Sequence, residues 1–258
     1  MKELTGFSKE EKESASFVIS DFDDTVTTDG LIYPDALESL YKLRDIGKKT
    51  IIVTGGSAGW ADSYMRLFPV DAVVAESGAL LLVREKGEIK YYVSPLIRDR
   101  AEYEKKKNDL MKETEKEYAF SSDQYCRIFD VAYERKSMDR DAEERLMKRL
   151  EKMDAKILVS SIHVNVLFSP LNKAKGLESF FPLLKRKLSV DMDFPRFTSS
   201  SIALGDSRND EELFSLIPLS VGNMRVKENE KAFSSLPKYY VKEYGSRAFA
   251  RTVSLLLS

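Results

Sequence analysis

A short apolar run that ends in a cluster of acidic residues places the tightest limit on the fold of this chain. Phe17-Val18-Ile19-Ser20 has the composition of a buried strand, and Asp21-Phe22-Asp23-Asp24-Thr25 follows it directly. A second run, Thr50-Ile51-Ile52-Val53, is β-branched and equally apolar. Between the two runs, residues 34–46 carry leucines at helical spacing, with Gly47 as a stop signal. This order of strand, helix and strand predicts a β-α-β unit with parallel strands and a right-handed crossover.

The β-α alternation continues for one more unit and then stops. A helix over residues 58–67 and a strand over 72–75 extend the first unit. The runs 80–83 and 89–93 flank a polar loop and predict a hairpin, at which a different module begins. That module is expected to contain two charged helices and three strands, over residues 98–118, 139–153, 125–132, 156–160 and 163–168.

After Pro170 the first pattern returns, which indicates that the sheet resumes. Helices and strands alternate over residues 175–188, 201–204, 210–217 and 219–221, and consecutive serines mark 194–201 as a surface loop. The sequence therefore predicts an α/β fold with a Rossmann-like, doubly wound parallel-sheet core. Residues 1–82 and 170–258 would form this core domain, and residues 83–169 would form an inserted α+β domain.

Composition excludes several functional classes. The 258 residues are 43% hydrophobic, which is enough for a sizeable core, and 41 basic residues balance 42 acidic ones. A formal net charge of −1 gives no overall field that would attract nucleic acid or an anionic membrane surface. The single cysteine, Cys126, forms no internal disulfide, and no apolar run is long enough to span a bilayer, so we expect a cytoplasmic protein.

Polar residues collect at the ends of three predicted core strands. Ligands in open α/β sheets bind at the carboxyl ends of the strands, beside the point where the strand order reverses. The three segments that should meet there are Asp21-Phe22-Asp23-Asp24-Thr25, Thr54-Gly55-Gly56-Ser57 and Gly205-Asp206-Ser207-Arg208-Asn209-Asp210. Several carboxylates that meet at this edge of the sheet repel each other and require a cation. Mg²⁺ fits best because it prefers oxygen ligands, and the only histidine, His163, gives no cluster that would favour zinc.

The same segments supply the groups for phosphoryl transfer. Asp21 and Asp23 are one residue apart, so one can attack phosphorus while the other protonates the leaving alcohol and later activates water. Thr54, Gly55 and Gly56 can hold a phosphoryl oxygen through a hydroxyl and close backbone N–H groups. A lysine would neutralise the remaining charge; we expect Lys175, which precedes Gly176 at a helix start, with Lys173 as the alternative.

Four segments in this order resemble the haloacid dehalogenase superfamily, specifically the Cof-like subfamily with a type IIB cap. They are Asp21-Phe22-Asp23-Asp24-Thr25-Val26, Thr54-Gly55, Lys175-Gly176 and Gly205-Asp206-Ser207-Arg208-Asn209-Asp210, and they span almost the whole chain. The resemblance implies that Asp206 binds Mg²⁺ together with Asp21 and the Asp23 carbonyl. It also implies that Asp210 supports the metal from behind, that Asn209 faces the substrate, and that the inserted domain is a cap that selects the leaving group.

Relatives in that subfamily include phosphatases of sugar phosphates, so the resemblance implies a phosphatase of a small phosphorylated molecule. Two alternatives remain open: a phosphomutase, which shares the nucleophile, and a receiver-like signalling module, which is phosphorylated on an aspartate. The sequence also departs from the subfamily pattern. Many relatives have Thr-Gly-Arg where this chain has Thr54-Gly55-Gly56, so any contact made by that arginine must come from elsewhere. The physiological substrate and the oligomeric state cannot be read from these residues.

Overall fold

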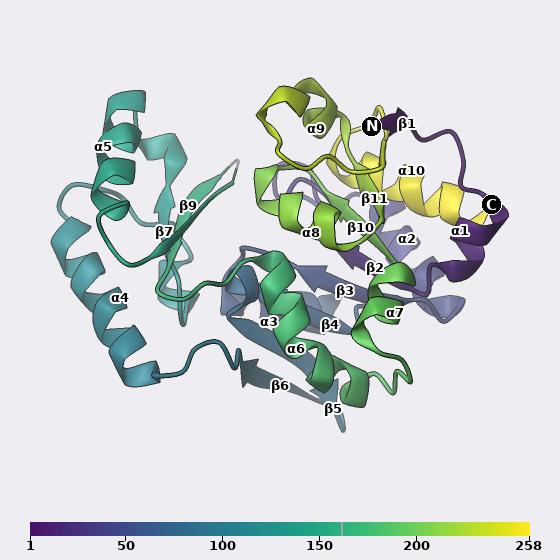
Figure 1. Cartoon of the computed structure of the whole chain (residues 1–258), viewed down its shortest axis with the longest axis horizontal. Coiled ribbons are helices and arrows are strands. Elements are labelled where there is room, and N and C mark those ends of the chain that lie inside the picture. Colours follow the sequence, from purple (N-terminus) through teal and green to yellow (C-terminus); the bar gives the residue numbers. More distant parts are fainter. Residues whose placement is uncertain (161) are drawn as a thin grey trace.

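A large, mostly parallel sheet forms the body of the molecule in the computed structural model, which describes residues 1–160 and 162–258 (Figure 1). Its strand order is β1-β12-β11-β10-β2-β3-β4-β5-β6. The strands are β1 (Lys2–Glu3), β2 (Phe17–Ser20), β3 (Lys49–Val53), β4 (Ala72–Ala75), β5 (Leu80–Glu85), β6 (Glu88–Val93), β10 (Ser201–Gly205), β11 (Leu219–Gly222) and β12 (Tyr239–Tyr240). All neighbouring pairs from β1 to β4 are parallel, and the β4–β5 and β5–β6 pairs are antiparallel.

The strand order reverses at β2. The chain leaves β2 toward β3 and β4 on one side and later returns to β10 and β11 on the other. Ile19 pairs with Ile51 of β3 and with Ala203 of β10, so β2 is held between the two halves of the sheet. The carboxyl end of β2 therefore lies at the switch point where ligands of such sheets bind. This confirms the predicted doubly wound α/β core.

Helices cover both faces of the large sheet, so alternate residues of its central strands are buried on opposite sides. Val18 packs in a core that includes Leu40 and Phe249, whereas Ile19 packs with Leu177 and Leu213 on the other face. The helices are α1 (Lys9–Ser14), α2 (Pro34–Asp45), α3 (Ala58–Leu67), α6 (Lys173–Lys187), α7 (Phe194–Ser199), α8 (Glu211–Leu216), α9 (Met224–Glu228) and α10 (Gly245–Leu257). Short 3₁₀ turns are η1 (Glu76–Gly78), η2 (Gln124–Cys126), η3 (Arg135–Ser137), η4 (Arg208–Asp210) and η5 (Glu230–Ala232).

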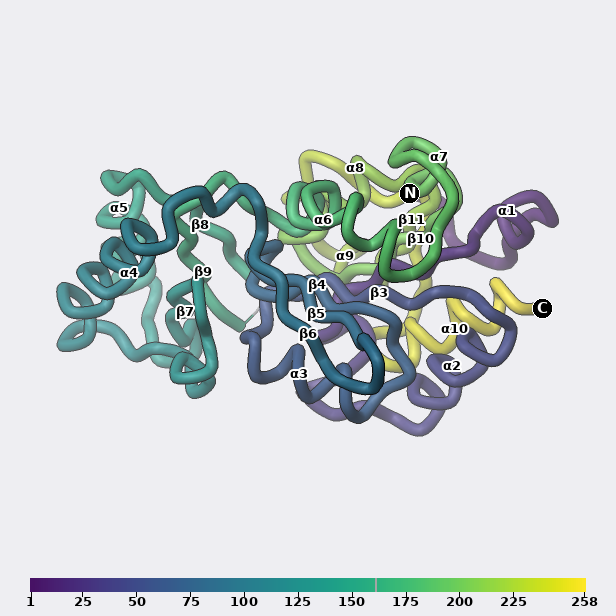
Figure 2. Tube along the Cα trace, turned by 90° about the horizontal axis from the view of Figure 1, so that it is seen from below, coloured from purple at the N-terminus to yellow at the C-terminus, as the bar shows by residue number. Residues whose placement is uncertain are grey.

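A second, smaller unit lies beside the large sheet in both views (Figures 1 and 2). It has an antiparallel sheet in the order β7-β9-β8 and two helices, and we refer to it as the cap. Its elements are α4 (Arg100–Thr114), β7 (Val131–Glu134), α5 (Arg140–Leu150), β8 (Lys156–Val159) and β9 (His163–Leu167). Leu110, Tyr133 and Leu146 belong to a core of its own, as expected for an inserted α+β unit. Among the helices of the described residues, none is both long and apolar enough to cross a membrane.

The hairpin β5–β6 belongs to the large sheet and not to the cap. Val74 of β4 pairs with Leu81 of β5, and Leu82 pairs with Tyr91 of β6. The expectation that a different module begins at this hairpin is therefore wrong. The reason is that Leu80 to Val83 is buried on both faces, as in a strand within a covered sheet. We propose that the cap begins after β6, later than residue 83.

Two further expectations need local correction. Residues 125–132 do not form one strand, because the backbone N–H groups of 128–130 bind the carboxylate of Glu76 and β7 begins only at Val131. Residues 194–201 do not form a surface loop. The side chain of Asp193 caps α7 there, and Phe197 is buried against Phe17.

Candidate active site

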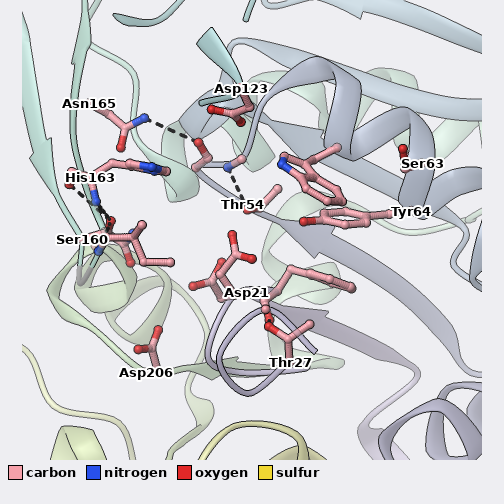
Figure 3. Close-up of a pocket in the computed structure, with 18 of the residues that line it drawn as sticks. Asp21, Thr27, Thr54, Ser63, Tyr64, Asp123, Ser160, His163, Asn165 and Asp206 are labelled. Atoms are coloured by element: carbon pink, nitrogen blue, oxygen red, sulfur yellow. Dashed lines mark hydrogen bonds between the residues drawn. The ribbon is translucent and has the colours of Figure 1, made fainter. Parts of the chain in front are cut away.

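The three polar strand ends meet at a cavity of about 240 Å³ between the large sheet and the cap (Figure 3). Asp21 follows β2, Thr54 follows β3 and Asp206 follows β10, and all three line the cavity. In Figure 3, Ser160, His163 and Asn165 of the cap lie on one side and Tyr64 of α3 on the other, with Asp21 between them. The sequence prediction that these distant segments share one site is therefore met by the geometry.

Three buried carboxylates form the centre of the site. Oxygens of Asp21, Asp206 and Asp210 lie within 4.8 Å of one another, and the residues are only 4%, 2% and 0% exposed. Asp210 is already engaged, since its Oδ2 accepts the N–H groups of Asp206 and Ser207 at 3.0 and 3.1 Å. Gly205 has no room for a side chain beside it, because a Cβ there would lie 2.5 Å from the Asp210 carboxyl carbon. Asp210 thus fixes the turn that presents Asp206 and supports the centre from behind.

Lys173, and not Lys175, is the lysine of this centre. Its Nζ lies 2.8 Å from Asp21 Oδ1 and 2.7 Å from Asp210 Oδ1, and its side chain is 1% exposed. Lys175 is two residues farther along α6, so its side chain leaves the helix about 200° away and points elsewhere. The expectation for Lys175 is therefore corrected in favour of the alternative, Lys173.

The Lys175-Gly176 pair serves the packing of α6. Asn172 caps this helix through its side chain, which accepts the N–H of Lys175. Gly176 lies against Gly78, where an added Cβ would be 2.3 Å from the Gly78 Cα. Only a glycine lets α6 begin this close to η1, and this close approach places Lys173 beside Asp21.

The donor set fits Mg²⁺. Within the described residues, the buried group consists of carboxylates alone, and hard oxygen ligands suit magnesium better than zinc. Asp21 and Asp206 are the residues that would hold the ion, with Asp210 behind them. The side chain of Asp23 lines the cavity and is not one of the three clustered carboxylates, so Asp23 is left to act on a substrate.

Burial raises the pKa of the carboxyl groups at this site. Desolvation raises the pKa of Asp21 to about 7; Lys173 opposes this shift, and the Asp210 charge adds to it. Burial likewise raises the pKa of Asp23 to about 6, and it raises the pKa of Asp206, where the Asp21 charge adds to the effect. A carboxyl group with a pKa near 6 can hold a proton for a leaving group near neutral pH.

We expect the metal-free protein to lose stability as the pH rises from about 4 to about 7. Folded Asp21, Asp23 and Asp206 keep protons in this window that the unfolded chain has released, so stability falls with pH. Bound Mg²⁺ would remove most of this loss of stability at high pH, because it compensates the charge of the carboxylates. Thermal unfolding in EDTA at pH 5.5 and 8, with and without Mg²⁺, measures the effect. A midpoint that rises with pH in EDTA would contradict this assignment of the pKa shifts.

The loop after β3 forms a tight turn in the wall of the cavity. Thr54 is 1% exposed, and its Oγ1 accepts the N–H of Gly56 at 2.9 Å. Gly55 and Gly56 both line the cavity. Asn209 lines it as well, and its Oδ1 accepts bonds from Ser207 Oγ at 2.7 Å and Lys173 Nζ at 3.3 Å. All four predicted phosphate-side residues other than Lys175 therefore lie at the site.

Arg127 of the cap contacts the Thr54-Gly55-Gly56 turn, which lacks the arginine found in many relatives of the resembled subfamily. Its Nη1 donates to the Gly55 carbonyl at 2.9 Å, next to the predicted phosphate-binding turn. The guanidinium is 1% exposed and bonds to the carboxylates of Asp123 and Asp130. Asn165 donates to Asp130 at 2.6 Å and completes the network. Sequence analysis did not find these residues, because nothing local indicates which cap residues face the core.

A buried carboxylate of the core also binds the cap. Glu76 is 0% exposed and accepts four backbone N–H groups, from Ala58 of α3 and from Ile128, Phe129 and Asp130 of the cap. Burial raises the pKa of Glu76 to about 7, and the Asp130 charge adds to this shift. The three bonds from the cap fix the backbone directly after Arg127, and together with the bond from Ala58 they hold the cap over the strand ends. We refer to this set of contacts as the Glu76 junction.

The wall of the cavity opposite the cap is aromatic. Phe22 and Tyr64 stack with ring centroids 3.8 Å apart, and Trp60 continues the stack at 6.0 Å from Tyr64. Trp60 remains 54% exposed although it is a large apolar side chain. His163 lies on the polar side of the cavity. The cavity is thus apolar on one side and hydrogen-bonding on the other.

Solved structures share this fold at low sequence identity. A haloacid dehalogenase-like hydrolase from B. subtilis superposes with a TM-score of 0.67 at 13% identity, over 93% of this chain and 99% of that one. The sucrose-phosphatase of Synechocystis sp. PCC6803, in complex with sucrose and phosphate, gives 0.63 at 17% identity, over 93% and 97%. The C-terminal domain of the C. albicans trehalose-6-phosphate phosphatase gives 0.63 at 16% identity, over 96% and 94%.

These likenesses define the class of fold. The chain has the fold of the haloacid dehalogenase-like hydrolases, with a parallel core sheet and an inserted cap, and the predicted resemblance is confirmed at the level of fold. No family model matches the sequence, and no curated protein matches it in sequence.

Proposed function

We propose that this protein is a Mg²⁺-dependent phosphatase that hydrolyses a small phosphomonoester through a phosphorylated Asp21. The observation that carries the proposal is the position of Asp21. It lies buried at the switch point of the sheet, 2.8 Å from Lys173 and clustered with Asp206, with Asp23 two residues farther on. This combination supplies a nucleophile, a cation beside it and a second carboxyl group for proton transfer. The phosphatases named among the similar structures support the same reaction class.

The reaction follows in two displacements. A carboxylate oxygen of Asp21 attacks phosphorus, the bond from phosphorus to the substrate oxygen breaks, and Asp23 gives its proton to that oxygen. Asp23 then takes a proton from water, which attacks the same phosphorus and releases Asp21 and inorganic phosphate. Thr54 and the backbone of Gly55 and Gly56 orient the phosphoryl oxygens. Mg²⁺ held by Asp21, Asp206 and the Asp23 carbonyl would supply positive charge that lets two anions approach.

The cavity favours a neutral leaving group with hydroxyls, such as a sugar. Its aromatic wall suits the C–H face of a ring, and Ser160, His163 and Asn165 offer hydrogen bonds opposite it. Arg127 is bonded to two carboxylates, so among the described lining residues no unpaired cation faces a second anionic group. A volume of about 240 Å³ is below the range of about 300–1,000 Å³ for drug-sized ligands, which indicates a monosaccharide phosphate.

The pairing of Arg127 with two carboxylates also argues against a phosphomutase. A mutase must rebind its bisphosphorylated intermediate in either orientation, and this needs cations at the cap end of the cavity. Arg127, the cap arginine that lines the cavity, already compensates Asp123 and Asp130. A receiver-like module has no use for a cap that encloses its aspartate. We therefore retain hydrolysis as the proposed reaction.

Phosphate release from a panel of small phosphomonoesters tests the proposal. With Mg²⁺ present, we expect hexose and pentose monophosphates to be hydrolysed faster than disaccharide phosphates, sugar bisphosphates or nucleotides. EDTA should abolish the release and added Mg²⁺ should restore it. Undiminished rates in EDTA would overturn the metal role, and transfer of phosphate to a second position without release would identify a mutase.

A further inference from the structure

Arg225 of α9 lies on a carboxylate of the proposed metal centre. Its Nη1 is 3.2 Å from Asp206 Oδ2 and 2.7 Å from Asp24 Oδ2. Asn223 caps α9 and also donates to the Asp24 carbonyl at 3.0 Å, so the helix start is tied to the loop after β2. The arginine side chain is 34% exposed, whereas that of Asp206 is 3% exposed. A surface helix thus places the positive charge of Arg225 beside Asp206, a buried carboxylate of the proposed metal centre.

The cations of the centre are divided between its carboxylates. Lys173 contacts Asp21 and Asp210, and among the ion pairs of the described residues Asp206 has Arg225 as its partner. Asp206 also lines a second cleft of about 640 Å³, which lies between the cap and α8–α9 and which Arg225 lines as well. The guanidinium therefore reaches Asp206 from a side other than the cavity that contains Asp21 and Thr54.

We propose that Arg225 shares Asp206 with the divalent cation and thereby weakens the binding of that cation. The inference rests on the proposed function, because it takes Asp206 as a metal ligand. Two cations at one carboxylate repel each other and divide its negative charge, so each binds less tightly than it would alone. Asp24 gives the guanidinium a second partner at a shorter distance, so Arg225 keeps an ion pair when the metal takes Asp206.

This arrangement gives Arg225 two effects. Without metal, it compensates a buried carboxylate that lies beside the charges of Asp21 and Asp210, which stabilises the folded site. With metal, its positive charge limits affinity, so the ion remains exchangeable. Arg225 is a residue that sets metal affinity and takes no part in bond breaking.

Removal of the charge is the direct test. Metal-free wild-type protein, Arg225→Gln and Arg225→Met are titrated with Mn²⁺, and free Mn²⁺ is measured by electron paramagnetic resonance; Mg²⁺ competition gives the second affinity. We expect both neutral variants to bind Mn²⁺ about tenfold more tightly, since a unit charge is removed a few ångströms away in a partly exposed site. Arg225→Lys keeps the charge and should stay nearer to the wild type than either neutral variant.

Lys227 provides a matched control. It is on the same helix, its side chain is also 34% exposed, and it pairs with Glu230 and not with the centre. Lys227→Gln should change Mn²⁺ affinity by less than about twofold, because a solvated charge is screened. Unchanged or weaker Mn²⁺ binding in both neutral Arg225 variants would overturn the inference while leaving the proposed function intact. No Mn²⁺ binding by any of the proteins would overturn the metal site itself, and the inference with it.

Discussion

Replacement of Asp21 by asparagine should reduce phosphate release by a factor of about a thousand or more, because an amide oxygen is a poor nucleophile and forms no stable acyl phosphate. The fold should survive. Asparagine has nearly the same shape, and its introduction removes one of three clustered carboxylates whose mutual repulsion is part of the pKa shift. Lys173 keeps its ion pair with Asp210 at 2.7 Å in the variant.

Initial rates of phosphate release and the thermal midpoint should be measured together for this variant. Asp45→Asn is a suitable control, since Asp45 is an exposed residue at the end of α2 that pairs with Arg44. The control should match the wild type in both measurements. A rapid acid quench with ³²P-labelled substrate should leave label on the wild-type protein and none on Asp21→Asn. Rates within tenfold of the wild type for Asp21→Asn would refute its role as nucleophile.

Replacement of Lys173 by methionine should reduce both stability and activity. The side chain is 1% exposed and lies between two buried carboxylates, Asp21 and Asp210. Removal of one partner from a buried ion pair costs about 3–5 kcal/mol, because the charge that remains is no longer compensated. Activity should fall more than about a hundredfold, since Lys173 also places the charge beside the nucleophile. Burial raises the pKa of Asp21 to about 7, so this carboxylate can take up a proton at low pH, and the loss of stability should be smaller at pH 5.5 than at pH 8.

Lys175 offers the matched control on the same helix. Lys175→Met removes an identical group two residues away that does not line the cavity, and it should cost less than about 0.5 kcal/mol. Urea denaturation and steady-state kinetics of the two variants separate the lysines. If Lys175→Met were inactive and Lys173→Met retained its activity, the placement of Lys173 at the centre would be wrong.

This pair of lysines also shows where prediction from the sequence reaches its limit. The core strands were predictable because β2, β3, β4 and β10 are continuous apolar runs, and their polar ends define the site without any knowledge of the cap. The choice between Lys173 and Lys175 depends on the first residue of α6, and helix ends are the least certain part of such a reading. Asn172, whose side chain caps the helix, is the local signal that favours Lys173.

The cap side of the site was beyond prediction for a different reason. Arg127 contacts Gly55 across 72 positions of sequence, and Asn165 approaches the same carbonyl across 110. Such contacts depend on how the cap packs against the large sheet, and no local spacing encodes that. The hairpin β5–β6 was wrongly predicted to begin the inserted domain. The end of the strand–helix alternation in the sequence marks the end of the parallel crossovers, and the sheet itself continues through the hairpin.

The Glu76 junction bears on how the molecule exchanges its ligands. Movement of the cap away from the strand ends would break three N–H···O hydrogen bonds to the buried Glu76 carboxylate and leave it with the single donor from Ala58. These hydrogen bonds stabilise the closed arrangement, and under the proposed function we expect the cap to open against them in each turnover. Under the proposed function, we therefore expect the release of inorganic phosphate, more than bond cleavage, to limit the rate of turnover.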